Sequence, residues 1–374
     1  MIIGVLREEQ DNRVSLIPND VKNLSQKGFS IWIEKEAGIK AGFNDEDYIQ
    51  AGAQIKDRQE VINADIILAI NRFNEMYNLK QGAFIIGLYN PYDLEFTKNF
   101  IDRTQGTVNC ISLELVPRIS RAQSIDVLSS MATMAGYKAV ILAAHYSSKI
   151  FPLLMTAAGT ITPAKVLVIG AGVAGLQAIA TSKRLGANVW GFDPRPATKD
   201  QIKSVGGNYI EFQIQDFEDK SGYAKQADHN IIQKEIEVLF PYVVQSDIVI
   251  TTASVPGKKA PILITREMVE KMRIGSVIVD MVAASGGNCE LTQKDKIVNF
   301  DNKIIIGYSN LPSMVPHDSS KMYSRNIYNL ISHLSRNTNR ITPDFQDEID
   351  RNIFLVYSRE IINEKIKGMM QEWK

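Results

Sequence analysis

Short apolar runs rich in β-branched residues alternate with polar, helix-compatible stretches in the first third of the chain. The polar stretches include residues 18–27 and 45–51, and the apolar runs are 2–6, 30–34, 66–70, 84–88 and 110–113. Strand–helix alternation at this spacing favours a parallel sheet with helices on both faces. We therefore expect a doubly wound α/β domain in this region.

Two long helical patterns bracket a second strand–helix series. Residues 124–145 favour one long helix with Ser124 as its N-cap, and residues 319–333 favour another. Between them, apolar strand patterns and helices follow one another from Val166 to about Gly307. The second series therefore predicts a second α/β domain.

This arrangement indicates that the first domain is discontinuous. We expect it to comprise residues 1–127 and 312–374, and the second domain to comprise residues 128–311. In the C-terminal segment, apolar residues at helical spacing predict a helix with one apolar face, formed by Ile349, Ile353 and Val356.

Charge and cysteine content narrow the class of protein. The 374 residues include 42 Lys plus Arg and 42 Asp plus Glu, so the formal net charge is zero. Nucleic-acid-binding domains usually carry a basic excess, so we expect no nucleic-acid partner. Cys110 and Cys289 lack metal-ligand spacing. We expect no metal site, no disulfide framework and a reducing, cytoplasmic compartment.

The sequence predicts neither a membrane span nor a cleaved signal. The apolar residues 1–6 are followed directly by charged residues. The apolar tract at 139–146 is shorter than the roughly 20 residues that a spanning helix needs. We therefore expect no transmembrane segment in this chain.

The strongest local motif is a glycine-rich turn that joins an apolar strand pattern to a helix. The turn runs from Gly170 to Gly175 with the sequence Gly-Ala-Gly-Val-Ala-Gly. Gly170 permits the tight turn, Gly172 lets the backbone approach a pyrophosphate, and Gly175 lets the helix pack on the strand. The helix begins at Val173 and Ala174, and its free N–H groups would face the phosphates. The motif predicts dinucleotide binding.

An acidic residue ends the next strand pattern, where it should meet the adenosine ribose. Asp193 lies about 20 residues after the glycines. Its carboxylate would repel a 2′-phosphate, which favours NAD(H). We include the adjoining Pro194 and Arg195 in the cofactor site, and interpret Arg195 as a helper to the diphosphate or as a solvated charge.

Two later strand patterns are followed by loops of small residues, 252–257 and 281–287. Ligands of open α/β sheets bind beyond the carboxyl ends of the strands. We therefore include Thr252 and Ala253 in the predicted cofactor site.

Blocks along nearly the whole chain resemble the alanine dehydrogenase/transhydrogenase family. Three of them resemble the family as a whole: 12–18 (Asn-Arg-Val-Ser-Leu-Ile-Pro), 41–48 and 268–280. The segment 117–130, Pro-Arg-Ile-Ser-Arg-Ala-Gln-Ser-Ile-Asp-Val-Leu-Ser-Ser, is similar to the nicotinamide-site loop of the NAD(H)-binding α1 subunit (domain I) of proton-translocating transhydrogenase. Residues 155–160 and 222–225 also resemble that subunit, and the latter resembles its mobile loop.

The positions that act in alanine dehydrogenase carry different residues here. That enzyme works with a lysine, a histidine and an aspartate around its keto-acid substrate, and the matching positions hold Asn71, Asn90 and Ala284. Transhydrogenases often carry an acid at the last position too. Reducing a carbonyl or imine moves a proton with the hydride, so a positioned acid or base is worth roughly 10²–10⁴ in rate. Transfer between two nicotinamide rings moves only a hydride and needs alignment in a dry site.

The resemblance implies a role for each residue of the nicotinamide loop. Arg118 would hold the nicotinamide carboxamide, and Asp126 and Ser129 would contact the same group. Gln123 would lie where the partner's nucleotide arrives and help to bridge the two cofactors. Tyr223 would close a loop over the nucleotide.

Together these features predict two doubly wound, Rossmann-like domains joined by long helices, with NAD(H) in the cleft between them. The resemblance implies direct hydride transfer to or from NADP(H) on a partner β subunit, coupled to proton movement in membrane subunits. It also implies a homodimer, peripheral on the cytoplasmic face of a bacterial inner membrane. Two alternatives stay open: an alanine dehydrogenase-like amino-acid/keto-acid oxidoreductase, and a non-enzymatic NAD-sensing module.

Overall fold

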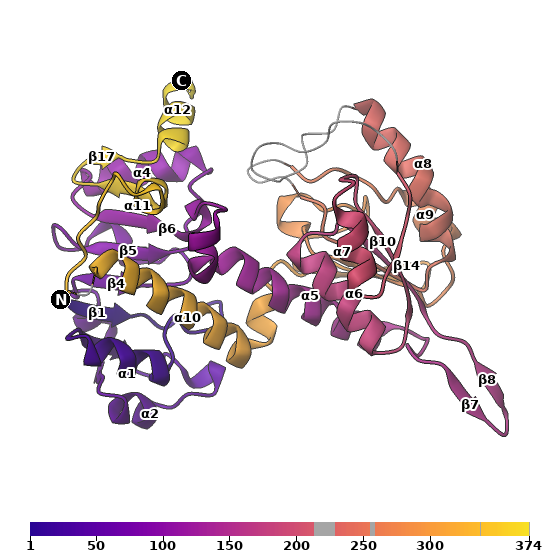
Figure 1. Cartoon of the computed structure of the whole chain (residues 1–374), viewed down its shortest axis with the longest axis horizontal. Helices are drawn as coiled ribbons and strands as arrows, with labels where there is room; N and C mark the ends of the chain where they lie inside the picture. Colours follow the sequence, from indigo (N-terminus) through magenta and orange to yellow (C-terminus); the bar gives the residue numbers. More distant parts are fainter. Residues whose placement is uncertain (213–228, 255–258, 337, 374) are drawn as a thin grey trace. The chain divides into compact units, whose positions relative to one another are not determined.

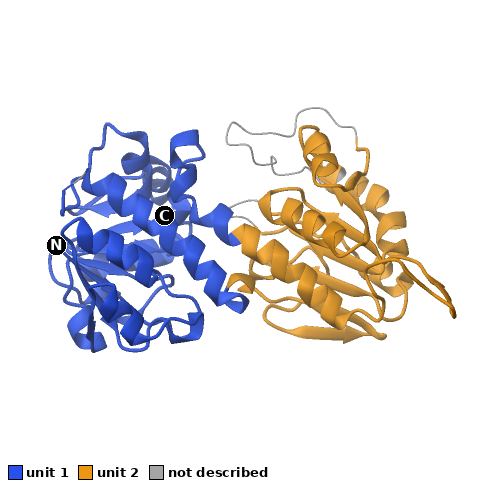
Figure 2. Ribbon diagram, turned by 60° about the horizontal axis from the view of Figure 1, so that its bottom comes forward, with its two compact units in different colours: residues 1–131, 313–374 blue, residues 132–312 orange. Residues whose placement is uncertain are grey.

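The chain folds into two units, each built around its own mixed sheet (Figure 2). The computed structural model describes residues 1–212, 229–254, 259–336 and 338–373. Unit 1 comprises Met1–Met131 and Ser313–Lys374, and unit 2 comprises Ala132–Pro312. Because each sheet is mainly parallel and connected through helices, the predicted fold class of two Rossmann-like domains is confirmed.

Unit 1 contains an eight-stranded sheet in the order β17-β16-β6-β5-β4-β1-β2-β3. The strands from β6 to β3 pair in parallel, whereas β16 is antiparallel to both β6 and β17. Their bounds are β1 (Ile2–Val5), β2 (Ser30–Glu34), β3 (Gln54–Lys56), β4 (Ile66–Leu68), β5 (Phe84–Gly87), β6 (Asn109–Ser112), β16 (Phe354–Tyr357) and β17 (Glu360–Ile361). The short edge strands β3 and β17, and β16 beside β17, were not predicted.

The helices of unit 1 come from both ends of the sequence, and α10 packs against α1 (Figure 1). The α-helices are α1 (Pro18–Gln26), α2 (Asp45–Gln50), α3 (Arg58–Val61), α4 (Leu94–Thr104), α10 (Pro316–Ser335), α11 (Glu348–Ile353) and α12 (Glu364–Glu372). Four short 3₁₀ helices are η1 (Ile39–Ala41), η2 (Asn74–Tyr77), η3 (Leu113–Leu115) and η4 (Ser120–Ile125).

The predicted helix through residues 349–356 is only half right. Ile349 and Ile353 lie on α11, but α11 ends there and Val356 lies in β16, opposite Cys110 of β6. All three predicted apolar residues are buried. Helical spacing could not exclude a change of element, because the run Phe-Leu-Val-Tyr also suits a strand.

Unit 2 contains a seven-stranded sheet in the order β11-β10-β9-β12-β13-β15-β14, parallel except for the β14–β15 pair. The strands are β9 (Lys165–Ile169), β10 (Asn188–Phe192), β11 (Asn208–Tyr209), β12 (Ile248–Thr251), β13 (Val277–Asp280), β14 (Ile297–Phe300) and β15 (Lys303–Ile306). Its other elements are the hairpin β7 (Leu154–Thr156) and β8 (Gly159–Ile161), and the helices α6 (Val173–Arg184), α7 (Thr198–Ser204), α8 (His229–Gln245), α9 (Arg266–Lys271) and η5 (Ala283–Ser285).

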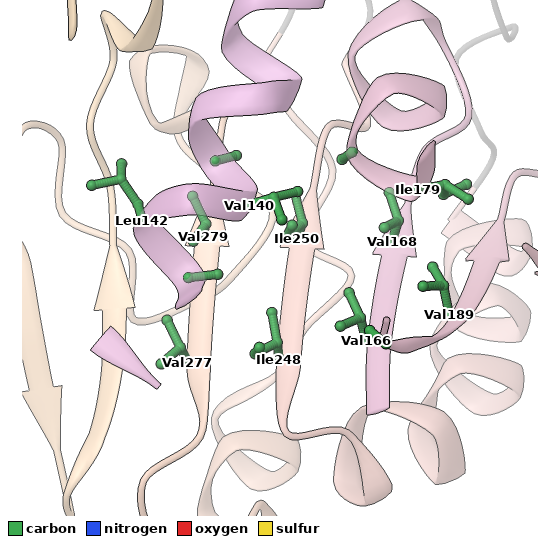
Figure 3. Close-up of a cluster of buried hydrophobic side chains, with 14 of the residues drawn as sticks. Val140, Leu142, Val166, Val168, Ile179, Val189, Ile248, Ile250, Val277 and Val279 are labelled. Carbon is green, nitrogen blue, oxygen red and sulfur yellow. The ribbon is translucent and has the colours of Figure 1, made fainter. Parts of the chain in front are cut away.

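Both faces of the central unit 2 strands are buried, which explains the continuous apolar runs at 166–169 in β9, 248–250 in β12 and 277–279 in β13. On β9, Val166 and Val168 face the cluster drawn in Figure 3, which also contains Val140 from helix α5 (Val127–Tyr146). Leu167 and Ile169 face a separate cluster on the other side of the sheet. Because β9 is packed on both faces and paired on both sides, its carboxyl end, where the glycine turn begins, is fixed by the sheet.

Helix α5 begins later than predicted. Ser124 lies in η4 rather than at a helix N-cap, and α5 begins at Val127. By length and composition α5 is apolar enough to cross a membrane, a property that the shorter tract at 139–146 did not predict. Ala139 and Ala143 of α5 are buried in the core of unit 2, and the core helices of soluble proteins share this composition.

Candidate functional site

The glycine turn between β9 and α6 is closely packed at two of its three glycines. Gly170 has a φ of 94°, and a Cβ there would lie 2.5 Å from Thr252 Oγ1. A Cβ on Gly175 would lie 1.8 Å from the carbonyl oxygen of Gly170. Gly170 is therefore needed for its left-handed backbone, and Gly175 for the close approach of α6 to the turn.

Gly172 is different, because the space beside it is open. Among the described residues, no heavy atom lies within 4 Å of a Cβ built at Gly172, and no side chain caps α6. The N–H groups of Val173 and Ala174 lie in the first turn of α6 and receive no hydrogen-bond acceptor from a capping side chain. An anionic diphosphate fits this place, because the helix start offers N–H donors and a positive dipole.

The loop after β12 lies beside the same turn. The Thr252 hydroxyl donates to the carbonyl oxygen of Gly170 at 3.1 Å. Ala253 donates its N–H to Asn288 Oδ1 at 3.1 Å, and its carbonyl accepts from Asn288 Nδ2 at 2.9 Å. The structure therefore brings Thr252 and Ala253 to the turn. Asn288, which is buried and holds this loop, was not predicted, because only its position after two glycines hinted at a structural role.

Asp193 lies buried at the end of β10, and each of its carboxylate oxygens accepts two hydrogen bonds. Oδ2 accepts from the N–H of Ala171 at 2.8 Å and from the Arg195 guanidinium at 3.0 Å. Oδ1 accepts from the Arg195 N–H at 3.0 Å and from its Nε at 2.9 Å. Arg195 is thus not a solvated charge, and Pro194 lies between the two paired residues. A ribose hydroxyl would share these oxygens with Arg195.

A second carboxyl group lies close to Asp193 and was not predicted. Glu235 on α8 is buried, and burial, with a smaller contribution from the negative charge of Asp193, raises its pKa to about 7. Helix α8 carries no motif that could have revealed it.

The predicted nicotinamide residues lie on one segment of unit 1, which includes η4 and the start of α5. Arg118 and Gln123 are exposed. Asp126 Oδ1 accepts from the N–H of Ser129 at 2.9 Å, and Oδ2 accepts from its hydroxyl at 2.5 Å. Asp126 therefore caps the first turn of α5 and is held in place by that role. Tyr223 lies outside the described residues.

The three positions that differ from alanine dehydrogenase lie in both units. Asn71 Nδ2 donates to Glu8 at 2.9 Å and to Asp11 at 3.3 Å, and burial raises the pKa of Glu8 to about 7. Asn90 donates its N–H to Glu114 at 2.7 Å, and Ala284 is exposed in η5. Asn71 is thus held by two carboxyl groups, and an amide at this position supplies no proton.

The comparisons with known proteins agree with this architecture. The chain matches the models for the alanine dehydrogenase/PNT N-terminal domain over residues 4–135 and the alanine dehydrogenase/PNT C-terminal domain over residues 139–364. The chain belongs to the alanine dehydrogenase/PNT family. The two matched domains together extend over both units of the fold described above.

Relatives in the family carry transhydrogenase names. The chain is similar to NAD(P) transhydrogenase subunit alpha of Haemophilus influenzae, with 43% identity over 97% of this chain and 72% of that one. It is similar to a Rickettsia prowazekii chain named as the first part of NAD(P) transhydrogenase subunit alpha, with 40% identity over 97% of this chain and 96% of that one. The solved structure of transhydrogenase from Sinorhizobium meliloti is similar over 98% of this chain and 100% of that chain, with 34% identity and a TM-score of 0.84.

Proposed function

We propose that this chain is the NAD(H)-binding subunit of a proton-translocating transhydrogenase and passes hydride directly between its NAD(H) and NADP(H) held by a partner subunit. The transhydrogenase relatives support this assignment. The observation that carries the choice of chemistry is that Asn71 and Asn90, whose side-chain amides cannot act as acids, stand where alanine dehydrogenase has a lysine and a histidine. A carbonyl or imine reduction needs a proton donor, whereas hydride transfer between two nicotinamides does not.

In this proposal the residues of unit 2 bind the adenosine and diphosphate parts of NAD(H). The start of α6, at Gly172 to Ala174, holds the diphosphate through backbone N–H groups, and Thr252 and Ala253 border the turn. Asp193 accepts from the ribose hydroxyls. Arg195 moves or shares its acceptors when the ribose arrives, because it already occupies both carboxylate oxygens.

The residues of unit 1 orient the nicotinamide. Arg118, with Asp126 and Ser129, binds the carboxamide and determines which face of the ring is presented. Gln123 bridges to the partner's nucleotide, and Tyr223 closes over the cofactor. The bound nicotinamide donates or accepts the hydride, and the chain contributes alignment and exclusion of water rather than a proton.

The same proposal includes an assembly. The chain forms a homodimer and associates with an NADP(H)-binding β subunit and with membrane subunits that move the proton. It is peripheral on the cytoplasmic face of a bacterial inner membrane. Co-purification of a tagged chain with those subunits from membranes tests this assembly, and recovery of the chain alone under mild conditions would contradict it.

The function is tested by mixing the purified chain with the NADP(H)-binding component of a transhydrogenase and following reduction of an NAD analogue by NADPH. We expect turnover in the mixture and almost none with either protein alone. No turnover in the mixture, with both proteins shown to bind their nucleotides, would contradict the proposal and favour an NAD-sensing module.

The rival enzyme function has its own assay. If the chain were an alanine dehydrogenase-like enzyme, the purified chain would oxidise NADH in the presence of pyruvate and ammonia without any partner protein. We expect a rate no higher than that of a control without enzyme. Robust turnover would replace the proposed function with the amino-acid/keto-acid reaction.

A further inference from the structure

The segment that carries the proposed nicotinamide residues is held by side chains from the C-terminal part of unit 1. Asn326 and Asn329, one turn apart on α10, both donate through Nδ2 to the carbonyl oxygen of Ser124, at 2.9 Å and 3.0 Å. Two donors saturate this carbonyl. The C-terminal end of η4 is thereby attached to α10, which packs against it.

Arg121 provides a second attachment near the start of η4. Its two terminal nitrogens lie 2.8 Å and 3.0 Å from the two carboxylate oxygens of Asp347. Asp347 is the N-cap of α11, where it accepts from the N–H of Ile349. The Arg121 guanidinium lowers the pKa of Asp347 to about 2, so this bidentate ion pair is charged at physiological pH.

Helix α11, which carries the Asp347 end of this ion pair, is itself held by further contacts. Asp350 on α11 is buried, lies 2.7 Å from His333 Nε2, and accepts from the Arg336 guanidinium at 3.0 Å. The group of His333, Asp347 and Asp350 is close enough to hold a metal ion. Because Arg121 and Arg336 already neutralise its two carboxylates, the group is explained as an ion-pair network that joins α10, α11 and η4.

Asn326 has a buried, unsatisfied amide oxygen, which is unfavourable and indicates that its other amide atom has a role. Its Oδ1 is buried and has no hydrogen-bond partner in the described part of the chain, while its Nδ2 donates to Ser124. Reversing the amide would place Oδ1 against the Ser124 carbonyl, so the contact determines the orientation. An apolar side chain would avoid the unsatisfied oxygen. The hydrogen bond to η4 therefore accounts for an asparagine at this position.

We propose that Asn326, Asn329 and Asp347, which we call the clamp, are positioning residues for hydride transfer. A six-residue 3₁₀ helix is longer than such helices usually are and has poor hydrogen-bond geometry, so it needs support from outside. The clamp acts through Arg121 and Ser124, which flank Gln123 and follow Arg118. It holds these side chains in place before the nucleotide binds, and this role rests on the proposed function.

The first test measures amide hydrogen exchange around η4, and it needs neither bound nucleotide nor catalytic turnover. Hydrogen exchange of amides 119–126 in the full, nucleotide-free chain should become about tenfold faster in Asp347→Ala and in the double variant Asn326→Ala/Asn329→Ala. Arg121→Ala removes the ion pair but leaves the α11 N-cap, and should have the same effect as Asp347→Ala. Unchanged exchange in all three variants would overturn the clamp, whatever the function.

Glu75→Ala is the matched control. Glu75 forms a bidentate pair with Arg58 at 2.7 Å and 3.0 Å, also in unit 1, and neither residue belongs to η4. This variant should leave exchange of amides 119–126 and hydride transfer at their original values. Equal acceleration of exchange in Glu75→Ala would show a general loss of stability and contradict a specific clamp.

The second test separates positioning from binding. With the NADP(H)-binding component present, Asp347→Ala should transfer hydride about tenfold more slowly, while its Kd for NADH changes less than twofold. The double variant Arg121→Ala/Asp347→Ala should be no slower than either single variant, because both remove one pair. A normal rate in Asp347→Ala beside an active original chain would refute the clamp alone. An inactive original chain would refute the proposed function, while the exchange experiment would still test the clamp.

Discussion

The two regions assigned to the cofactor are built in opposite ways. In unit 2 the glycine turn is a backbone device, in which a left-handed Gly170, an open Gly172 and a tightly packed Gly175 lie within six consecutive residues. In unit 1 the segment around Arg118 and Gln123 would act through its exposed side chains. The glycines that form the first lie in one continuous segment, whereas the second is held by residues far away in the sequence.

This difference separates binding from alignment. A turn made of backbone donors tolerates little change in its glycines, and the side chains that bond to it, Thr252 and Asp193, lie in the same unit. A loop held by Asn326, Asn329 and Asp347 is sensitive to substitutions that never touch a ligand. We therefore expect variants of unit 2 to change affinity or stability, and variants of unit 1 to change the rate of hydride transfer.

The largest effect should come from the glycines of the turn. Gly175→Ala places a Cβ 1.8 Å from a backbone carbonyl, and should lower the free energy of unfolding by about 3 kcal/mol and abolish NADH binding. The new Cβ of Gly172→Ala meets no atom of the described residues within 4 Å, so this variant should retain stability but bind NADH about 100-fold more weakly. Chemical denaturation and NADH fluorescence titration measure both effects.

Gly368→Ala is the control for this pair. Gly368 lies on α12 in unit 1, and a Cβ there also meets no atom within 4 Å in the part of the chain that the structure describes. It should bind NADH normally. Equal NADH affinity in Gly172→Ala and Gly368→Ala would remove the glycine turn from the proposed site.

The next largest effect should be on the rate in unit 1. Arg118→Ala and Gln123→Asn should slow hydride transfer about 100-fold, because misalignment of the reacting rings costs rate steeply, while NADH affinity changes less than fivefold. Stopped-flow transfer to an NAD analogue in the presence of the NADP(H)-binding component measures the rate. Arg340→Ala, an exposed arginine of unit 1, is the control. If both variants transferred hydride at the original rate, the assignment of the loop would be wrong.

A smaller effect is expected at the ribose end of unit 2. Asp193→Ser removes the acceptor of the ribose hydroxyls and should weaken NADH binding about tenfold, and it should narrow the preference over NADPH. Asp200→Ser removes an exposed acid of α7 and should change neither. Calorimetric titration with NADH and NADPH measures both affinities. An unchanged NADH affinity in Asp193→Ser would contradict the placement of the ribose at Asp193.

The smallest effect concerns Glu235 and pH. Its pKa rises from 4.5 to about 7 on folding, so between these values the folded chain binds a proton that the unfolded chain releases. The free energy of unfolding should therefore fall by about 3 kcal/mol as the pH rises from about 4.5 through about 7. Glu235→Gln should lack this contribution to the pH dependence, and Glu237→Gln, exposed on the same helix, should keep it. Urea unfolding at pH 5 and pH 8 measures the difference, and parallel profiles for all three proteins would contradict it.

Local patterns predicted the elements whose form depends on neighbouring residues. The strand–glycine turn–helix from Lys165 to Arg184 and the strand that ends before Asp193 were predicted correctly, because the β-branched run and the glycine spacing lie within one continuous segment. The start of α5 was predicted too early, because Ser124 is a good N-cap in isolation but is held in η4 by α10.

What the sequence alone determined is the α/β class and the backbone geometry of the glycine turn, since a glycine's backbone freedom and a strand's alternation are local properties. Only the tertiary structure showed that Arg195 pairs with Asp193, that Glu235 is buried near them, and that Asp347 holds Arg121. The Glu235 and Asp347 contacts join residues from different elements, and the Arg195 contact, although local, is one of several conformations that the segment after β10 could adopt. Their partners are decided by how the elements pack, and a linear pattern holds no record of that packing.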